Sequence, residues 1–231
     1  MKILAIETSS KICGVAISEN DKIINEILIE DENTHSVKVM PTIDEILKKN
    51  KLELDDIDLF TCDIGPGSFT GIRIGIATVK GFADFSNKYV YGVSSLENLA
   101  YNVKESGIIC SLIDAKNNNV YFGLFEKKEE QIKAIENFKF DSIDNIITKL
   151  KEINDKIIFV GDGASNYKEK IIYELNENSI FKGDKENKLN AHNLAIIAYK
   201  NFNEGKNEIR PLYLRKSNAE RLLEEKDGNI N

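Results

Sequence analysis

The chain has 231 residues, of which 42% are hydrophobic, so it can build a core for two small lobes or one large domain. Its formal net charge of −7 argues against a protein whose whole surface binds nucleic acid, because such a surface needs clustered positive charge. The apolar run at 3–6 is too short for a signal peptide, and no later run approaches the length of a membrane span. We therefore expect a cytoplasmic protein without membrane contact, whose partners are proteins or small molecules.

Cysteines and histidines suggest neither a disulfide framework nor a metal site. Cys13, Cys62 and Cys110 are odd in number, widely spaced and set in apolar runs, which predicts reduced, buried thiols. His35 and His192 lie far apart in sequence, so a solvent or helix-capping role is expected for each.

The opening of the chain reads as three strands followed by a helix. Two polar turns join three runs of strand-forming residues, which predicts an antiparallel meander over 2–7, 12–18 and 22–30. Apolar spacing predicts a helix over 35–50. Pro41 lies inside this helix, so a bend or a fresh start is expected near Met40.

A glycine loop then connects a predicted strand at 57–64 to a helix that begins near Ile72. The loop is Gly65-Pro66-Gly67-Ser68-Phe69-Thr70-Gly71, in which Ser68 or Thr70 can cap the helix. One interpretation is a plain strand-to-helix turn, and the other is an anion cradle at a helix N-terminus. The spacing matches neither the Walker A loop nor the dinucleotide fingerprint.

The helix that follows, over 72–85, is apolar or small around most of its circumference. Arg73, Lys80 and Asp84 form one narrow charged stripe, whereas the remaining faces need cover. Gly71, Gly75 and Gly81 leave little bulk, so another helix could approach closely. The cover is either a neighbour within the chain or a protein partner.

From residue 108 the opening pattern is repeated. After a strand at 89–93 and a short helix with a predicted capping box of Ser94 and Glu97, the order strand, strand, strand, helix, strand returns. The predicted elements of this second copy are 109–114, 120–126, 131–137, 142–154 and 156–160. Because no counterpart of the glycine-loop helix is evident, the second copy is expected to be truncated. Further helices are predicted over 166–175 and 191–202.

Duplicated units of this kind describe an actin-like α/β architecture with two lobes, whose two polar turns would face each other around phosphates. The candidate nucleotide-site residues are Glu7, Thr8, Ser9, Ser10, Asp114, Lys116, Gly161 and Gly163. The alternative is that these are ordinary turn residues. The expected divisions are a first lobe at 1–105, a second at 106–188, a returning helix at 189–205 and a charged tail at 206–231.

Several of these motifs resemble the TsaB (YeaZ) family, and the resemblance covers nearly the whole chain. The motifs are Leu4-Ala5-Ile6-Glu7-Thr8, the glycine loop through Gly75, Gly92-Val93-Ser94-Ser95-Leu96, Ile113-Asp114-Ala115, Gly161-Asp162-Gly163 and Pro211-Leu212-Tyr213-Leu214-Arg215. The family's usual opening is Asp-Thr-Ser, whereas Glu7 stands first here.

The resemblance implies a non-catalytic subunit in the placement of a threonylcarbamoyl group on N6 of adenosine 37 of tRNA. It implies a heterodimer with the catalytic paralogue TsaD, joined by TsaE, with threonylcarbamoyl-adenylate supplied by TsaC or a relative and a homodimer in isolation. ATP and metal are expected on the partner subunits and no cofactor on this chain. TsaD carries a His-x-x-x-His metal pair, and the corresponding positions here are Ser95 and Leu99, which cannot replace imidazoles.

In the family, the first two long helices form the partner surface. The expected interface residues are Val39, Ile43, Leu47, Gly71, Ile72, Gly75, Ile76, Val79 and Ala83. The main alternative function is an ATP-dependent phosphotransferase or ATPase of the actin and sugar-kinase type, with Glu7 and Asp114 around magnesium. A peptidase has no support, because no nucleophile-base arrangement is visible. Arg210, Arg215, Lys216 and Arg221 could contact the phosphates of tRNA, but the nearby glutamates favour a solvated tail.

Overall fold

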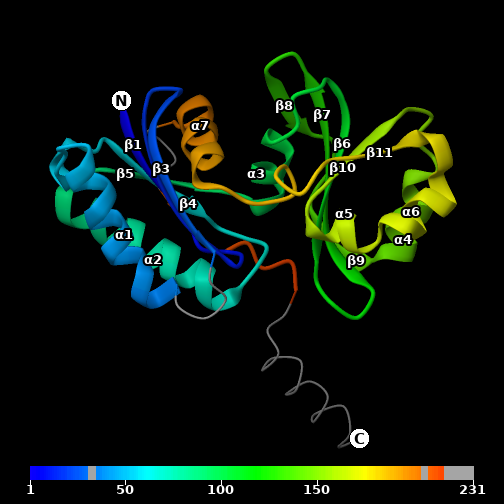
Figure 1. Cartoon of the computed structure of the whole chain (residues 1–231), viewed down its shortest axis with the longest axis horizontal. Coiled ribbons are helices and arrows are strands. Elements are labelled where there is room, and N and C mark those ends of the chain that lie inside the picture. Colours follow the sequence, from blue (N-terminus) through cyan, green and yellow to red (C-terminus); the bar gives the residue numbers. More distant parts are fainter. Residues whose placement is uncertain (31–34, 204–207, 216–231) are drawn as a thin grey trace, which may run out of the picture.

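The computed structural model describes residues 1–30, 35–203 and 208–215, and in these residues the chain forms two β-sheets in two lobes (Figure 1). Three antiparallel strands open the first sheet and two parallel strands extend it in the order β3-β2-β1-β4-β5. The predicted meander is thus confirmed. The strands are β1 (Lys2–Glu7), β2 (Ile12–Glu19), β3 (Lys22–Glu30), β4 (Leu59–Asp63) and β5 (Tyr89–Val93).

The second sheet repeats this strand order. Its described strands run β11-β10-β6-β7-β8, with β9 also paired to β7. This match confirms the duplication inferred from the sequence. The sequence did not predict β9 or β11, because strands of three or four residues are too short to show an alternating pattern. The strands are β6 (Gly107–Asp114), β7 (Asn119–Lys128), β8 (Gln131–Ala134), β9 (Lys139–Ser142), β10 (Ile157–Val160) and β11 (Ser179–Phe181).

Helices α1 (His35–Lys49) and α2 (Phe69–Ser86) lie together on one face of the first sheet (Figure 1). Ser68 caps α2 by accepting a hydrogen bond from the Gly71 N–H, so the helix starts at Phe69, three residues earlier than predicted. Helix α1 is continuous through Pro41, and the fresh start expected near Met40 does not occur. The 3-10 turn Leu54–Asp56 connects α1 to β4.

The second sheet has corresponding helices, which corrects the expected truncation. Helix α4 (Ile143–Leu150) takes the place of α1, and α5 (Asp162–Asn166) with α6 (Lys168–Leu175) takes the place of α2. The helix is broken at Tyr167, whose ψ of 15° departs from the helical value, and this break conceals the counterpart in the sequence. The second lobe is therefore shorter but complete in its connections. A 3-10 turn, Asn176–Asn178, leads to β11.

Two helices exchange between the lobes. Helix α3 (Ser95–Tyr101) follows the last strand of the first sheet, yet Leu96 and Leu99 join the core of the second sheet. Helix α7 (Ala191–Asn201) follows the second sheet, yet Leu194 and Ala195 pack against the first sheet (Figure 1). The predicted division at 105/106 therefore separates stretches of sequence but not packing units.

Buried asparagines join the two exchanged helices where they meet. The amide of Asn193 in α7 donates to the Asn98 carbonyl oxygen of α3 (3.0 Å) and to the side-chain oxygen of Asn102, which caps the end of α3 (2.8 Å). The amide of Asn98 in turn donates to the carbonyl oxygen of Asn190 (2.9 Å). These bonds connect the lobes at the end of the first repeat.

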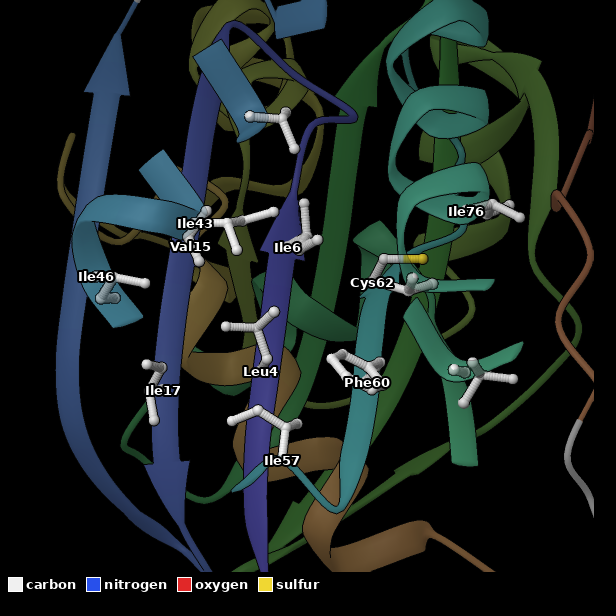
Figure 2. Close-up of a cluster of buried hydrophobic side chains, with 14 of the residues drawn as sticks. Leu4, Ile6, Val15, Ile17, Ile43, Ile46, Ile57, Phe60, Cys62 and Ile76 are labelled. Carbon is white, nitrogen blue, oxygen red and sulfur yellow. The ribbon is translucent and has the colours of Figure 1, made fainter. Parts of the chain in front are cut away.

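The main core of the first lobe lies between its sheet and the α1–α2 layer (Figure 2). Leu4 and Ile6 of β1 and Phe60 of β4 contribute its sheet side, and α1 contributes Ile43 and Ile46. Every one of these side chains is at most 2% exposed. Burying each such side chain contributes about 1.5–3 kcal/mol, so this layer supplies much of the lobe's stability.

The predicted state of the cysteines is confirmed. Cys13, Cys62 and Cys110 are free and buried.

The other sequence predictions have mixed outcomes. The His192 ring contacts the Glu26 carboxylate (2.8 Å) at the start of α7, whereas the His35 side chain lies outside the described residues. No helix in the described ranges has the length and apolar character of a membrane span. Lys216 and Arg221 of the basic tail also lie outside the described residues.

Candidate functional site

A cleft of about 610 Å³ lies between the two lobes. The turn after β1 forms one wall with the glycine loop, and the turn after β6 forms the other with the start of α5. The structure thus brings both polar turns to one cleft, as the actin-like architecture predicted. The polar lining residues include Ser9, Ser10, Lys11, Asp114, Lys116 and Asp162.

The glycine loop packs tightly against the first polar turn. A Cβ atom at Gly67 would overlap the Ser9 carbonyl oxygen, and one at Gly71 would overlap the Thr8 carbonyl oxygen. The Ser68 N–H donates to the Ser9 carbonyl (2.7 Å), and the Thr8 hydroxyl donates to the Gly71 carbonyl (2.8 Å). Because the Ser68 and Gly71 N–H groups already have acceptors within the chain, this geometry favours a close-packed turn over an open anion cradle.

Glu7 lies behind the cleft and not in it. The side chain is fully buried, and its Oε1 accepts hydrogen bonds from the Ser9 N–H and hydroxyl, both at 2.8 Å. Asp63, at the end of the neighbouring strand β4, is 1% exposed and accepts from the Gly65 N–H (2.7 Å) and the Ser95 hydroxyl (2.6 Å). The prediction that Glu7 would reach a nucleotide is therefore wrong, because the side chain turns into the protein.

Burial sets the charge state of these two acids. Desolvation, followed by the nearby Asp63 carboxylate, raises the pKa of Glu7 well above its usual range. Burial also raises the pKa of Asp63, to about 6, while hydrogen bonds from Ser95 and Gly65 oppose the rise. Both shifts favour the protonated form, so the pair as a whole holds a proton more tightly than two exposed carboxyl groups would.

Asp114, the counterpart of Glu7, does line the cleft. Its carboxylate accepts from the Lys116 backbone N–H (2.9 Å), forms an ion pair with the Lys116 Nζ (2.8 Å) and accepts from the Asn166 amide (3.1 Å). Partial burial acts to raise the pKa of Asp114, but these hydrogen bonds outweigh it and leave the pKa lowered. The anion is therefore satisfied by the protein's own groups.

The predicted Gly161 and Gly163 serve packing at the start of α5. A Cβ at Gly161 would overlap the Leu112 carbonyl oxygen, and Gly161 also has a φ of +107°. Between them, Asp162 lines the cleft and accepts from the Asp114 N–H (2.9 Å). Among the residues that the structure describes, no cluster of three or more His, Cys, Asp or Glu side chains could hold a metal ion.

A segment near the C-terminus, residues 208–215, bridges the lobes beside the cleft. The Leu212 N–H donates to the Ile64 carbonyl (2.8 Å), and Tyr213 stacks on Phe69 with 4.6 Å between ring centroids. Arg215 then reaches the second lobe, where it donates to the Ala115 carbonyl (3.2 Å). We call residues 208–215 the strap. The sequence motif Pro211-Leu212-Tyr213-Leu214-Arg215 lies in this segment, but its role in bridging the lobes was not predicted.

The nine residues expected at a partner interface lie in the chain's own core instead. Their side chains or Cα atoms are buried against the first sheet, because the apolar stripes of α1 and α2 face it. The residues concerned are Val39, Ile43, Leu47, Gly71, Ile72, Gly75, Ile76, Val79 and Ala83. The outer surface of this layer presents other apolar side chains: Val37 and Met40 on α1 and Phe85 on α2 are 68%, 53% and 83% exposed.

Comparisons with known proteins agree with the resemblance. Residues 22–224 match the model of a family described as TsaD: tRNA N6-adenosine threonylcarbamoyltransferase. The tRNA threonylcarbamoyladenosine biosynthesis protein TsaB of Haemophilus influenzae is 30% identical over 93% of this chain and 94% of its own length. TsaB of Bacillus subtilis is 29% identical over 95% and 96%.

A solved structure shares the fold. A Pseudomonas aeruginosa protein described as similar to peptidase YeaZ superimposes with a TM-score of 0.78 at 22% identity, covering 93% of this chain and 99% of that one. The similarity to the TsaB proteins extends over nearly full length in both directions. The chain therefore belongs to the TsaB (YeaZ) family, within the wider group that the TsaD family model describes.

Proposed function

We propose that this chain acts in tRNA threonylcarbamoyladenosine biosynthesis as a non-catalytic subunit that pairs with TsaD. The observation that carries the proposal is the outer surface of the α1–α2 layer, where Val37, Met40 and Phe85 expose apolar side chains. Exposed apolar side chains on both helices of one layer favour a protein partner. TsaE would join the pair, and two copies of this chain would use the same layer in the absence of TsaD.

The cleft supports a non-catalytic role. Ser95 and Leu99 occupy the positions at which the resemblance places the metal-binding histidines of TsaD, and both are buried. The Ser95 hydroxyl is committed to Asp63. Asp114 is paired with Lys116, and Glu7 faces away from the cleft. The carboxylates proposed for magnesium therefore already have partners within the protein.

The partner surface can be tested with a matched pair of variants. Phe85→Asp places a charge on the α1–α2 layer and is expected to abolish co-purification with TsaD from the same organism, because interfaces depend on a few buried aromatic anchors. Tyr173→Asp on α6 is the control, since Tyr173 is 81% exposed against 83% for Phe85 but lies on the second lobe. Equal retention of TsaD by both variants would contradict the proposed surface.

The complex as a whole requires a reconstitution. TsaC, TsaD, TsaE and this chain are incubated with tRNA, threonine, bicarbonate and ATP, and each protein is left out in turn. We expect modified adenosine only when this chain is present. Undiminished modification without it would refute a role in this process, whereas modification without TsaD would refute the non-catalytic assignment.

The size of the cleft leaves one further candidate function, an ATP-dependent phosphotransferase or ATPase. A cavity of about 610 Å³ falls in the range of small-molecule sites. Calorimetry of the isolated chain with ATP and magnesium distinguishes the two functions. Micromolar binding followed by turnover would favour the enzyme, and no heat of binding would favour the subunit.

A further inference from the structure

The two buried acids at the ends of β1 and β4 hold three segments together. One oxygen of Glu7 binds the N–H and hydroxyl of Ser9 in the first polar turn. One oxygen of Asp63 binds the Gly65 N–H of the glycine loop and the Ser95 hydroxyl of α3. Since α3 packs on the second sheet, this cluster also links the lobes.

The other oxygen of each acid has no hydrogen-bond partner among the residues that the structure describes. Oε2 of Glu7 and Oδ2 of Asp63 are completely buried and contact no donor there. The two acids end neighbouring parallel strands, directly after the paired Ile6 and Cys62, and the Asp63 carboxylate is near enough to raise the pKa of Glu7. Two carboxylates have four acceptor oxygens and no donor, so a hydrogen bond between them requires a proton on one of them.

We propose that Glu7 and Asp63 share one proton, and that this proton joins the first polar turn, the glycine loop and α3 into one unit that loosens in alkaline solution. When the proton leaves to water, two negative charges remain side by side in a buried site. Their repulsion then acts on the strand ends that carry Ser9 and Gly65. The inference concerns the chain alone and does not depend on any partner.

The neighbouring titratable groups do not supply a compensating change of charge. Cys13 on β2 and Cys62 on β4 face the pair, and burial raises the pKa of both thiols, so they stay neutral. The charge of Lys38 on α1 lowers the pKa of Cys13 slightly, against the larger effect of burial. The remaining neighbours named above, Ser9 and Ser95, do not titrate.

The sign of the pH effect follows from the shared proton. A carboxyl group whose pKa is higher in the folded than in the unfolded chain contributes stability below the unfolded value, near 4, and loses it as the pH rises through the folded value. Because burial raises the pKa of Asp63 to about 6 and raises that of Glu7 well above its usual range, the loss begins above pH 4 and continues until the higher of the two folded values is passed.

The test compares urea unfolding of the wild type and Glu7→Gln between pH 6 and pH 9. Glutamine keeps an oxygen for Ser9 and gives Asp63 a permanent N–H donor, so it mimics the protonated acid. We expect the urea midpoint of the wild type to fall across this range and that of Glu7→Gln to change by less than half as much. Parallel curves for the two proteins would overturn the proposal.

Glu97 provides the matched control. It is a partly buried acid, whose pKa burial raises to about 7, but it lies on α3 without contact to the Glu7 and Asp63 pair. Glu97→Gln should keep the part of the pH dependence that Glu7→Gln removes. If Glu97→Gln alone flattens the curve, the titrating acid is Glu97 and the proposal is wrong.

A measurement on the wild type covers the case in which Glu7→Gln does not fold. Carboxyl carbons labelled with ¹³C in glutamate are followed by NMR, and the signal missing in Glu97→Gln identifies Glu97. Aspartate carboxyl carbons are labelled in a second sample, and we expect one carboxyl group of the Glu7 and Asp63 pair to stay protonated at pH 7. In hydrogen exchange, the Ser9 and Gly65 amides should lose protection at pH 9 relative to the Ser68 amide, after correction for the intrinsic rate. Full ionisation of both Glu7 and Asp63 at pH 7 would overturn the proposal.

Discussion

The two lobes place an acid at the same point of a repeated fold and give it opposite surroundings. Glu7 ends β1 in a fully buried site, whereas Asp114 ends β6 at the cleft beside the Lys116 ammonium. Burial raises the pKa of Glu7, and hydrogen bonds lower that of Asp114 despite partial burial. Equivalent backbone positions therefore do not imply equivalent charge, which depends on whether a cation and water reach the carboxyl group.

The two lobes also differ in how closely a helical glycine approaches a neighbouring backbone. Gly71 approaches the Thr8 carbonyl oxygen too closely for any Cβ, whereas a Cβ at Gly163 would lie 3.0 Å from the Leu112 carbonyl oxygen. Within the two helices, Gly71 of α2 thus has a closer backbone contact than Gly163 of α5.

The largest expected effect is that of Gly71→Ala. Because the overlapping atom belongs to the backbone, we expect a loss of about 3–5 kcal/mol in the free energy of unfolding, or failure to fold. Gly163→Ala should cost about 1–2 kcal/mol. Gly81→Ala is the control, since open space surrounds it and alanine favours helix by about 0.5–1 kcal/mol. Urea denaturation followed by circular dichroism measures all three, and equal losses at Gly71 and Gly163 would remove the distinction between the lobes.

The next effect contrasts the two acids directly. Glu7→Ala leaves the Ser9 donors without an acceptor and Asp63 as an unpaired buried charge, so we expect a loss of about 2–4 kcal/mol. Asp114→Ala removes an ion pair whose Lys116 side chain is 80% exposed, and should cost about 1 kcal/mol. Unfolding in urea at pH 6 gives both values. A greater loss for Asp114→Ala would reverse the comparison.

The strap allows a smaller test of how the lobes are joined. Tyr213→Ala removes the ring stacked on Phe69 and the hydroxyl that accepts from the Arg73 Nε (2.8 Å). We expect a loss of about 1–1.5 kcal/mol, of which Tyr213→Phe should retain the stacking part. Thermal unfolding of the two variants separates the contributions. A stability of Tyr213→Ala equal to that of the wild type would show that the strap does not hold the lobes.

The smallest expected effect is on how the stability of the protein depends on pH in acidic solution. Because the folded chain lowers the pKa of Asp114, its contribution is present above the unfolded pKa, near 3.9, and is lost as the pH falls through the folded value. Asp114→Asn should therefore weaken the dependence of the urea midpoint on pH between about 4 and 2. It should leave the alkaline dependence assigned to Glu7 and Asp63 unchanged, and an effect on that branch would couple the two lobes.

The sequence predicted most of the fold, because the strands are long and the repeat is regular. The order strand, strand, strand, helix, strand recurs from residue 108, and this recurrence reveals the duplication. The second glycine-loop helix stayed hidden because Tyr167 divides it into α5 and α6. The exchange of α3 and α7 could not be predicted either, because apolar spacing shows which face is buried but not which sheet buries it.

The candidate site was predicted only in part. Ser9, Asp114 and Lys116 do line one cleft, whereas Glu7 turns away from it. Asp63 was missed, although a signal was present: like Glu7, it is a carboxylate at the end of an apolar strand, and the two strands are parallel neighbours. The interface residues were misplaced because a stripe that packs on the chain's own sheet has the same sequence pattern as one that packs on a partner.

The exchanged helices have a consequence for dissection of the protein into fragments. A fragment that ends at residue 105 would contain Leu96 and Leu99 without the sheet that covers them, and the complementary fragment would leave a sheet face bare. The same holds for α7 and the first sheet. We therefore expect the gene to tolerate no simple bisection, and calorimetry of the intact protein to show a single cooperative melting transition.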